Sequence, residues 1–558
     1  MTSPRWSGLR PYFAGACVVL TLAAGSGRAG DNDAELRSVL EQQSKQIAEQ
    51  QKQLEALRQR LDAAEAAKVE ARPTSAHEPA LNDTSVQKIV TDYLDEKAKK
   101  ETEDAKAQQK KADDEGYKVG TILNNVTARW DPANGMRFET PNKDFTFHAG
   151  FRFQLDTAYW TQTSASLKAA QLGDLQDGTF FRRVRPSFDG TMWEIIEYNV
   201  EPAFEQVQNG VPNFDDVSVS ISKLPIIGTV RIGHQKVPQG FEGDMYSSSK
   251  AMTFLERSAY TDAFYENFAT GISATNAFLD QRMTYAAMAY FQDNNPINSN
   301  TNNAVFFGDG VAGYTGRLTG LPLWENDGRC FLHLGVSGTW RNNARPGQDL
   351  ADPRLDRFRA RPQLRDAIGD YGNGVLSGNS SRMVDTGTFP STSTGILGLE
   401  LFYVMGPFSF QSEYAWATAH SVFFGGKNIG EVGFGGGYVQ VSYFLTGENR
   451  IYDRRFGREG TTYISRPYTP FWLVRDDEGG LSWGRGAWEL AARYNYLNLN
   501  DAPIHGGELD GLELGVNWYL NTNLKFQFMY LHENSFGQPA GKVPAAVDGF
   551  GIRTQLFF

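Results

Sequence analysis

The segment LELGVNWYLNTNLKFQFMY, residues 512–530, decides the fold because apolar and polar residues alternate along it with a period of two. The apolar positions of its first half are Leu512, Leu514, Val516, Trp518 and Leu520. Those of its second half are Leu524, Phe526, Phe528 and Tyr530. The tripeptide Asn521-Thr522-Asn523 between the halves is typical of a tight turn. A period of two is typical of half-buried strands, so the segment predicts two antiparallel strands joined by a short turn.

The same period recurs along most of the chain. It is clearest between Phe145 and Tyr159 and between Phe550 and Phe558. Counting similar segments predicts about sixteen strands, and an even number of this size is typical of bacterial outer-membrane barrels. The strands are expected to begin near residues 145, 180, 195, 216, 228, 267, 281, 311, 330, 394, 408, 433, 486, 509, 523 and 549.

The predicted connections mostly alternate between long and short, as expected when one barrel end carries loops and the other carries tight turns. The stretch from Thr446 to Arg485 is the exception, because a long connection stands where a short one is expected. Its periodicity leaves two interpretations open. It contains a further strand pair, or it folds inward.

Composition supports strands and narrows the class of protein. Aromatic residues make up 13% of the 558 residues, and 57 glycines accompany them. This mixture favours many strands and turns over helix bundles. The formal net charge of −11 argues against a general nucleic-acid binder.

The N-terminus has the pattern of an export signal. Arg5 and Arg10 precede an apolar run over residues 12–24, which predicts a signal peptide over residues 1–29. Its removal leaves Cys330 as the one cysteine of the exported chain. No later segment contains the roughly 18 apolar residues that a transmembrane helix needs. The exported chain is therefore expected to be periplasmic, secreted or an outer-membrane barrel.

Residues 30–71 predict a helical coiled coil. Apolar residues spaced by three and four recur at Leu36, Leu40, Ile47, Leu54, Leu57 and Leu61. Gln43 and Gln50 occupy the same seam, which suits a small oligomer held together elsewhere, and a solvated single helix is the alternative. Residues 72–120 are polar and charged and predict a linker. The barrel is assigned to residues 121–558.

The alternation also indicates which solvent surrounds the sheet. Soluble β-sandwiches alternate too, but aromatic-rich faces, a signal peptide and a last strand that ends on Phe558 favour an all-β transmembrane antiparallel barrel. In lipid every backbone polar group must be paired internally, which strands achieve by closing into a barrel. Water then wets the charged positions of the inner face, which include Glu489, Arg493, Lys525 and Arg553.

Four stretches in this order resemble the phosphate-selective porin O and P family. They are FFRRVRPSFDGTMWEIIEYNVEPAFE from Phe180, VRIGHQKVPQGFEGDMYSSSKAMTFLERS from Val230, YVQVSYFLTGENRIYDRRFG from Tyr438 and GAWELAARYNYLNLND from Gly486. The resemblance runs from about Thr121 to the C-terminus. It implies a trimeric, sixteen-stranded channel in the outer membrane of a Gram-negative-type cell. It also implies passage of anions, phosphate among them, past basic side chains and segments folded into the lumen.

Three basic clusters are candidates for anion binding along the pore. The first, in the long loop between about residues 341 and 390, comprises Arg354, Arg357, Arg359, Arg361 and Arg365. The second, in the anomalous connection, comprises Arg450, Arg454, Arg455, Arg458 and Arg466. The third comprises Lys236, Lys250 and Arg257, with Arg183 and Arg185 on the inner face of an early strand. Guanidinium groups can bind phosphate oxygens bidentately, which is why arginine is the residue type of interest.

Structural ion pairs are the alternative interpretation of these clusters. Loop arginines are often solvated or paired with nearby acids, which here are Asp349, Asp352, Asp356, Asp366 and Asp370. The strand residues Arg183, Arg493 and Arg553 can equally form a lumen network with acids such as Glu197, Glu201 or Glu489.

Signals for an enzyme are weak in this sequence. The seven histidines, at positions 77, 148, 234, 333, 420, 505 and 532, show no metal-ligand spacing. The glycine pattern at Gly308, Gly310 and Gly313 is followed by Tyr314, so a glycine-rich loop explains it better than a dinucleotide site.

We therefore expect passive diffusion of small anions through a homotrimer in outer-membrane lipid, without cofactor or metal. The alternatives are a porin that is non-selective or specific for another solute, or a barrel hydrolase. The N-terminal helix is expected in the periplasm, where it can contact the cell wall.

Overall fold

The computed structural model describes residues 126–131, 135–141, 143–161, 175–208, 211–244, 248–292, 311–343, 354–365, 382–460, 472–475, 480–537 and 544–558. The predicted signal peptide, coiled coil and linker, residues 1–29, 30–71 and 72–120, lie outside these ranges. Among the described residues, no helix is long and apolar enough to cross a membrane.

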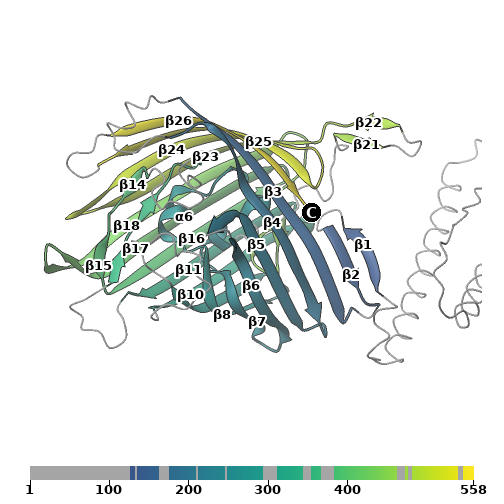
Figure 1. Cartoon of the computed structure of the whole chain (residues 1–558), viewed down its shortest axis with the longest axis horizontal. Coiled ribbons are helices and arrows are strands. Elements are labelled where there is room, and N and C mark those ends of the chain that lie inside the picture. Colours follow the sequence, from purple (N-terminus) through teal and green to yellow (C-terminus); the bar gives the residue numbers. More distant parts are fainter. Residues whose placement is uncertain are drawn as a thin grey trace, which may run out of the picture. The chain divides into compact units, whose positions relative to one another are not determined.

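Sixteen antiparallel strands form a closed barrel, as predicted (Figure 1). The first eight are β3 (Phe145–Trp160), β4 (Gly178–Met192), β5 (Ile196–Gln208), β6 (Val211–Leu224), β7 (Gly228–Lys236), β8 (Phe268–Phe278), β9 (Met283–Gln292) and β10 (Val311–Glu325). The last eight are β11 (Cys330–Asn342), β16 (Ser393–Met405), β17 (Phe408–Phe424), β18 (Lys427–Phe444), β23 (Ala487–Asp501), β24 (Ile504–Tyr519), β25 (Leu524–Phe536) and β26 (Ala545–Phe557). Pairing of β26 with β3 closes the ring.

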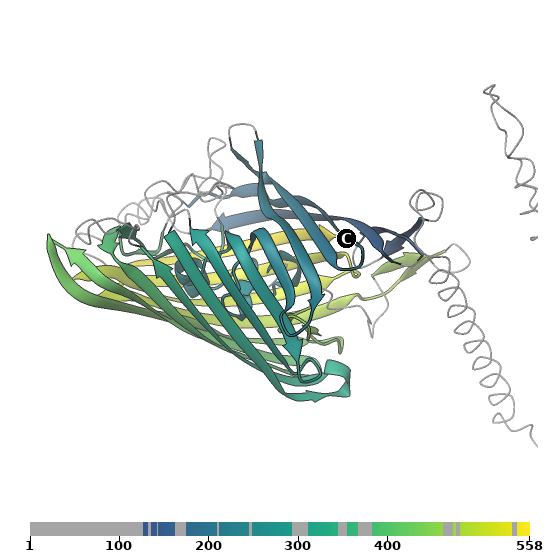
Figure 2. The ribbon, with the colours of Figure 1, turned by 90° about the horizontal axis from the view of Figure 1, so that it is seen from below.

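The predicted strand starts agree with the structure to within a few residues. The largest difference is at β18, which was expected near residue 433 and begins at Lys427. Figure 2 shows that the strands run obliquely around the barrel, as closure of a sheet requires.

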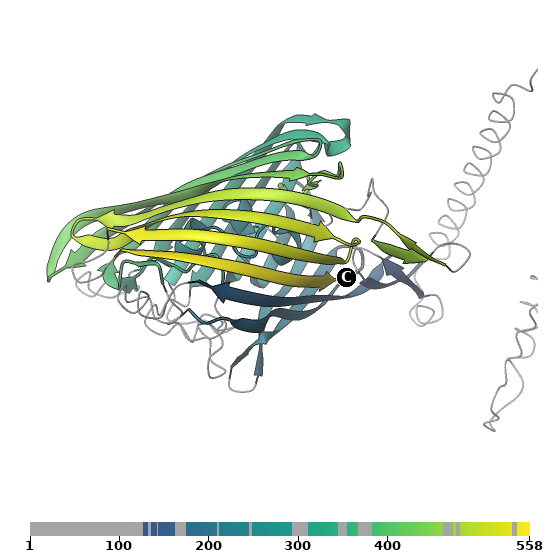
Figure 3. The ribbon, with the colours of Figure 1, turned by 90° about the horizontal axis from the view of Figure 1, so that it is seen from above.

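The two barrel ends differ in their connections. Short turns lie at one end, here called the turn end, and include residues 193–195, 225–227, 279–282, 326–329 and 521–523. The opposite loop end carries the long connections of residues 237–267 and 343–392, whereas the long connection of residues 445–486 lies at the turn end. The backbone of Phe558 exchanges two hydrogen bonds with Phe151, of 3.0 and 3.1 Å, and this fixes the C-terminus at the turn end (Figure 3).

A hairpin that was not predicted extends the sheet at the turn end. It comprises β1 (Thr127–Asp131) and β2 (Gly135–Glu139), and β2 pairs with residues 146–149 of β3. The indole of Trp130 packs on Phe558, with ring centroids 5.1 Å apart.

The faces of the barrel wall have the polarity expected of a membrane protein. Large apolar side chains are exposed on the outer face, among them Leu334, Val336, Leu397, Leu399, Leu512, Leu514, Phe528 and Ile552. On the inner face, four charged side chains that were predicted to be wetted by water are buried. They are Glu489, Arg493, Lys525 and Arg553. This arrangement suits lipid outside and paired polar groups inside.

Parts of two loop-end connections fold into the lumen and bury apolar side chains there. The first, residues 237–267, contains α4 (Phe241–Asp244), α5 (Ser248–Ala251) and α6 (Ala259–Phe264). The second contains two short strand pairs, β12 (Arg354–Asp356) with β15 (Phe389–Ser391) and β13 (Arg359–Ala360) with β14 (Val384–Asp385). Tyr260 and Phe264 of α6 share an apolar cluster with Phe358. The two connections therefore support each other inside the barrel.

The anomalous connection between β18 and β23 contains further strand pairs and also folds inward, so both interpretations of the sequence apply to it. Its first part forms a hairpin of β19 (Tyr452–Asp453) and β20 (Arg458–Glu459), which turns inward. The carbonyl oxygen of Gly457 accepts a 2.8 Å bond from Arg317 on the inner face of β10. A Cβ atom at Gly457 would lie 2.3 Å from the Thr284 hydroxyl, so glycine is required where the hairpin meets the wall. Its second part forms another hairpin, of β21 (Leu473–Arg475) and β22 (Leu481–Trp483).

Candidate functional site

Residues 237–267, which we name the constriction segment, connect β7 to β8 and are held by side chains of strands on the far side of the barrel. Lys525 of β25 and Arg493 of β23 donate to the carbonyl oxygens of Met252 and Glu256, at 2.9 and 2.8 Å. The Glu413 carboxylate of β17 accepts bonds from the backbone amides of residues 241 and 242, at 2.6 and 2.9 Å. The segment therefore crosses the lumen from β7 and β8 to the wall formed by β17 and β23–β25.

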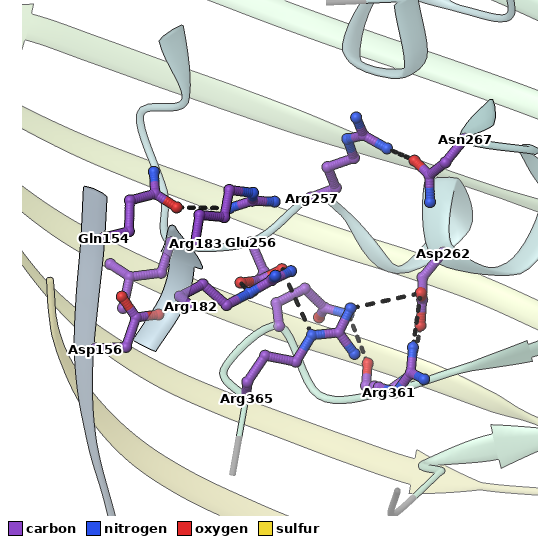
Figure 4. Close-up of polar contacts among 12 residues, drawn as sticks. Gln154, Asp156, Arg182, Arg183, Glu256, Arg257, Asp262, Asn267, Arg361 and Arg365 are labelled. Carbon is purple, nitrogen blue, oxygen red and sulfur yellow. Dashed lines mark hydrogen bonds and ion pairs between the residues drawn. The ribbon is translucent and has the colours of Figure 1, made fainter. Parts of the chain in front are cut away.

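A β-bulge brings two consecutive arginines of β4 toward this segment. In the register with β3, Gln154 pairs with Arg183 but Leu155 pairs with Phe181, so Arg182 is the extra residue. A bulge interrupts the alternation of faces, and both arginines point inward (Figure 4). The sequence predicted Arg183 on the inner face, and regular alternation would have turned its neighbour Arg182 outward. The doublet Arg182-Arg183 was the available signal for the irregularity.

Two carboxylates of the constriction segment collect most of the nearby arginines (Figure 4). Glu256 accepts two bonds from Arg182, at 2.6 and 2.9 Å, and lies 3.5 Å from Arg365. Asp262 on α6 accepts a 2.9 Å bond from the amide of Arg361, and its oxygens lie 3.3 to 3.8 Å from three guanidinium groups. Those groups belong to Arg361, Arg365 and Arg382.

We define the arginine cluster as Arg182, Arg183, Arg257, Arg361, Arg365 and Arg382. Six guanidinium groups thus gather around two carboxylates, Glu256 and Asp262. Such an excess of positive charge in a largely buried space favours anions over cations.

Arg183 and Arg257 differ from the other members of the cluster in their partners. Arg183 donates to the Gln154 side-chain oxygen at 2.7 Å, and Arg257 donates to the Asn267 side-chain oxygen. In the described part of the chain, both hydrogen-bond acceptors are therefore neutral amides. A neutral acceptor leaves the guanidinium charge uncompensated by direct contact, so these two groups are the best placed to attract an anion.

The electrostatic environment keeps both carboxylates of the constriction segment charged. Burial raises the pKa of Glu256, but Arg182 and Arg365 outweigh it and hold that pKa well below its usual range. Burial acts in the same direction on Asp262, and Arg361, Arg365 and Arg382 together lower its pKa. Both carboxylates are therefore negatively charged at neutral pH.

The structure brings four of the predicted basic residues together in the cluster, namely Arg183, Arg257, Arg361 and Arg365. Carboxylates bind five others, in the pairs Arg185–Glu205, Arg357–Asp385, Arg450–Glu459, Arg454–Asp280 and Arg455–Asp453. For these five, the ion-pair interpretation agrees with the contacts. The part of each in ion conduction stays a prediction.

The remaining candidates are dispersed. Lys236 ends β7, Arg359 lies in β13, Lys250 lies over the Phe557 ring and Arg458 lies over the Phe456 ring. The side chain of Arg354 and all of Arg466 lie outside the described residues.

The ion partners of the strand arginines differ from those proposed from the sequence. Arg493 pairs with Glu242 and Glu513, at 3.0 and 2.8 Å, rather than with Glu489. Sequence reasoning also missed Arg382, Glu256 and Asp262. These residues lie in the loop-end connections, outside the barrel strands, where no period of two indicates which way a side chain points. Among the described residues, no group of histidine, cysteine and acidic side chains is arranged to hold a metal ion.

A closed sixteen-stranded barrel with an apolar outer face and charged segments across its lumen defines a channel-forming protein of the outer membrane. The chain belongs to the phosphate-selective porin O and P family, whose model matches residues 147–558. This confirms the resemblance found in the sequence.

Two relatives and one solved structure illustrate the similarity. An uncharacterised protein of Caulobacter vibrioides is 28% identical over 93% of this chain and 88% of its own length. Porin O of Pseudomonas aeruginosa is 27% identical over 76% of this chain and 91% of its own length. OmpT, an outer membrane protein of Vibrio cholerae in its trimer form, aligns with a TM-score of 0.42 and 10% identity over 74% of this chain and 99% of that chain.

Proposed function

We propose that the barrel conducts small anions by passive diffusion, phosphate among them, and that the arginine cluster is the place where they bind transiently. The observation that carries the proposal is the pair of cations with neutral hydrogen-bond partners, Arg183 beside the constriction segment and Arg257 within it. Membership of a porin family supports the channel.

Transient binding follows from the composition of the cluster. Glu256 and Asp262 already neutralise part of its charge, so an entering anion competes with them for the same guanidinium groups. Conduction requires sites strong enough to admit an ion and weak enough to release it. The net charge of −11 for the whole chain does not oppose this, because selectivity depends on the local potential.

Single-channel recording in planar bilayers under a potassium chloride gradient tests the proposal. We expect a reversal potential of the sign for chloride, and phosphate added to one side is expected to block the chloride current. A reversal potential of the sign for potassium would refute anion preference. A value near zero would support the non-selective alternative. Absence of conductance with hydrolysis of lipid or peptide would support the hydrolase alternative.

The further expectations about assembly belong to the same proposal. The mature chain forms a homotrimer in outer-membrane lipid after loss of residues 1–29. Residues 30–71 form a coiled coil in the periplasm that can contact the cell wall, and residues 72–120 link it to the barrel. Transport involves no covalent step and no cofactor, and the porin family membership supports a channel rather than an enzyme.

A further inference from the structure

The hairpin of β21 and β22, which we name the tryptophan hairpin, lies outside the sixteen-stranded wall. Its root is joined to the barrel by a 2.9 Å bond from the amide of Trp472 to the carbonyl oxygen of Leu520. Figures 1 and 3 show the two strands extending beyond the ends of the barrel strands at the turn end. The hairpin is thus an addition to the outside of the wall near its rim.

An indole stack connects the hairpin to the outer face of the barrel. The rings of Trp483 and Trp472 meet edge to face, with centroids 5.2 Å apart. Trp472 meets Trp518 of β24 in the same way, at 5.7 Å, and Trp518 stacks on Trp488 of β23 at 5.1 Å. The indole nitrogens of Trp488 and Trp518 donate to the Arg485 carbonyl oxygen, at 3.1 and 3.0 Å.

The stack continues the apolar outer face without a break. Trp488 is followed on its strand by the outward Leu490, and Trp518 is preceded by the outward Leu514. At the far end of the stack, Trp483 is 67% exposed and Leu481 is 59% exposed. Large apolar side chains are therefore presented just beyond the rim, next to the exposed Arg485.

We propose that the tryptophan hairpin lies in the phospholipid head-group layer of the turn-end leaflet and anchors the barrel there. Indole rings prefer the boundary between hydrocarbon and water, because they combine a large apolar area with a polar N–H group. A nearby arginine suits the phosphate groups of the same layer. Continuity with the lipid-facing band is the reason for choosing lipid rather than a second protein as the partner.

A second hairpin at the same end supports the lipid interpretation. The β1–β2 pair also adds to the outside of the sixteen strands, beside the closing strands β26 and β3. It exposes Trp130 and Met136, of which Trp130 is 56% accessible. Two separate additions at one rim therefore present tryptophan outward.

Site-directed spin labelling of the full mature chain in phosphatidylethanolamine and phosphatidylglycerol vesicles tests this proposal. A nitroxide is attached to Leu481→Cys in a Cys330→Ser background, and its collisions with oxygen and with a water-soluble nickel complex are compared. Leu514→Cys is the control for lipid exposure, and Lys427→Cys, at the exposed start of β18, is the control for water. Heat-dependent gel migration confirms that each variant is folded.

We expect the Leu481 label to give an oxygen-to-nickel collision ratio between those of the two controls. A ratio equal to that at Lys427 would place the hairpin in water and refute the proposal. Spin–spin broadening that disappears when labelled chains are mixed with an excess of unlabelled chains would identify a second copy as the partner instead. Both readouts are independent of ion selectivity, so failure of the channel proposal would leave this result interpretable.

Discussion

Arg553 of the last barrel strand donates a 3.2 Å hydrogen bond to Glu256 of the constriction segment, although 297 residues separate the two in the chain. The same guanidinium binds Asp156 of the first barrel strand through two bonds, of 2.7 and 2.6 Å, and also reaches the carbonyl oxygen of Leu255. One side chain thus connects the strand pair that closes the barrel with the segment that crosses it. Barrel closure and constriction geometry are physically coupled.

Loss of this arginine is expected to destabilise the barrel. Arg553→Met leaves the buried carboxylate of Asp156 without its ion pair, and breaking a buried pair costs about 3 kcal/mol of unfolding free energy. Urea denaturation in lipid vesicles measures the change. Arg129→Met is the control, because this exposed side chain lies 3.5 Å from Glu139 and a surface pair contributes less than about 1 kcal/mol. Equal effects of the two substitutions would contradict the structural role of Arg553.

Removing the two cations with neutral partners is expected to reduce anion preference. In the double variant Arg183→Gln and Arg257→Gln, the side chains stay polar but lose their positive charge. We expect the reversal potential in a salt gradient to move toward zero. Lys427→Gln removes one exposed charge far from the cluster and serves as the control, with no shift expected. A wild-type reversal potential in the double variant would show that selectivity arises elsewhere.

The ion selectivity of the channel in acid is expected to report on the protonation of Glu256. Its folded pKa is held well below the usual range, because Arg182 and Arg365 outweigh the effect of burial. The charged Glu256 carboxylate then contributes fully to the stability of the folded state above its unfolded pKa of about 4.3. This contribution is lost as pH falls through the folded pKa. Selectivity should therefore be constant from about pH 7 to about pH 5 and become more anionic in stronger acid.

The variant Glu256→Gln separates this effect from general acid damage. It lacks the negative charge at every pH, so stronger anion preference is expected already at neutral pH. An acid transition of wild-type size in Glu256→Gln would assign the titration to another group.

Alkaline titration is expected to report on Lys250. Burial and, to a lesser extent, Arg152 lower the pKa of this amine to about 8, although Glu201 and Asp189 act in the opposite direction. The amine is charged below that pH and neutral above it, so anion preference should fall as pH rises through about 8. Lys250→Arg keeps its charge and should remove the transition while preserving selectivity at neutral pH. A transition that persists in Lys250→Arg would exclude Lys250 as its source.

Deletion of Arg182 tests the bulge in β4. Since Arg182 is the extra residue, its removal should restore regular alternation and keep Phe181 outward and Arg183 inward. We expect the shortened chain to form a heat-modifiable barrel that lacks the contact with Glu256. Deletion of Val184 is the control, because it removes the same number of residues but turns Arg183 toward lipid, where a charged side chain is destabilising. Assembly of both deletions with equal yield would argue against the bulge.

Much of the fold could be predicted because the residues of each strand alternate between a face toward lipid and a face toward the polar interior. The alternation in segments such as residues 512–530 follows from lipid on one face and polar groups on the other, so periodicity predicted sixteen strands and their approximate starts. The bulge at Arg182 and the β1–β2 hairpin escaped this reasoning, because both depend on pairing with β3 rather than on a local pattern.

The candidate site was predicted by residue type and incompletely by position. Four of the predicted basic residues lie in the cluster, whereas Arg185, Arg357 and Arg450 are held by carboxylates. Which arginine meets an acid depends on how the constriction segment and the β11–β16 connection fold into the lumen, and irregular backbone has no period from which to infer this. Arg382 and Asp262 meet in that way, across 120 residues of chain.

The sequence by itself determined that this chain is a barrel with an apolar outer face, because the polarity of each face of a strand depends on the alternation of neighbouring residues. Tertiary structure alone decided which charges neutralise one another inside. Coulombic attraction depends on distance in space, and contacts between residues far apart in the chain exist once the ring has closed around its inward segments.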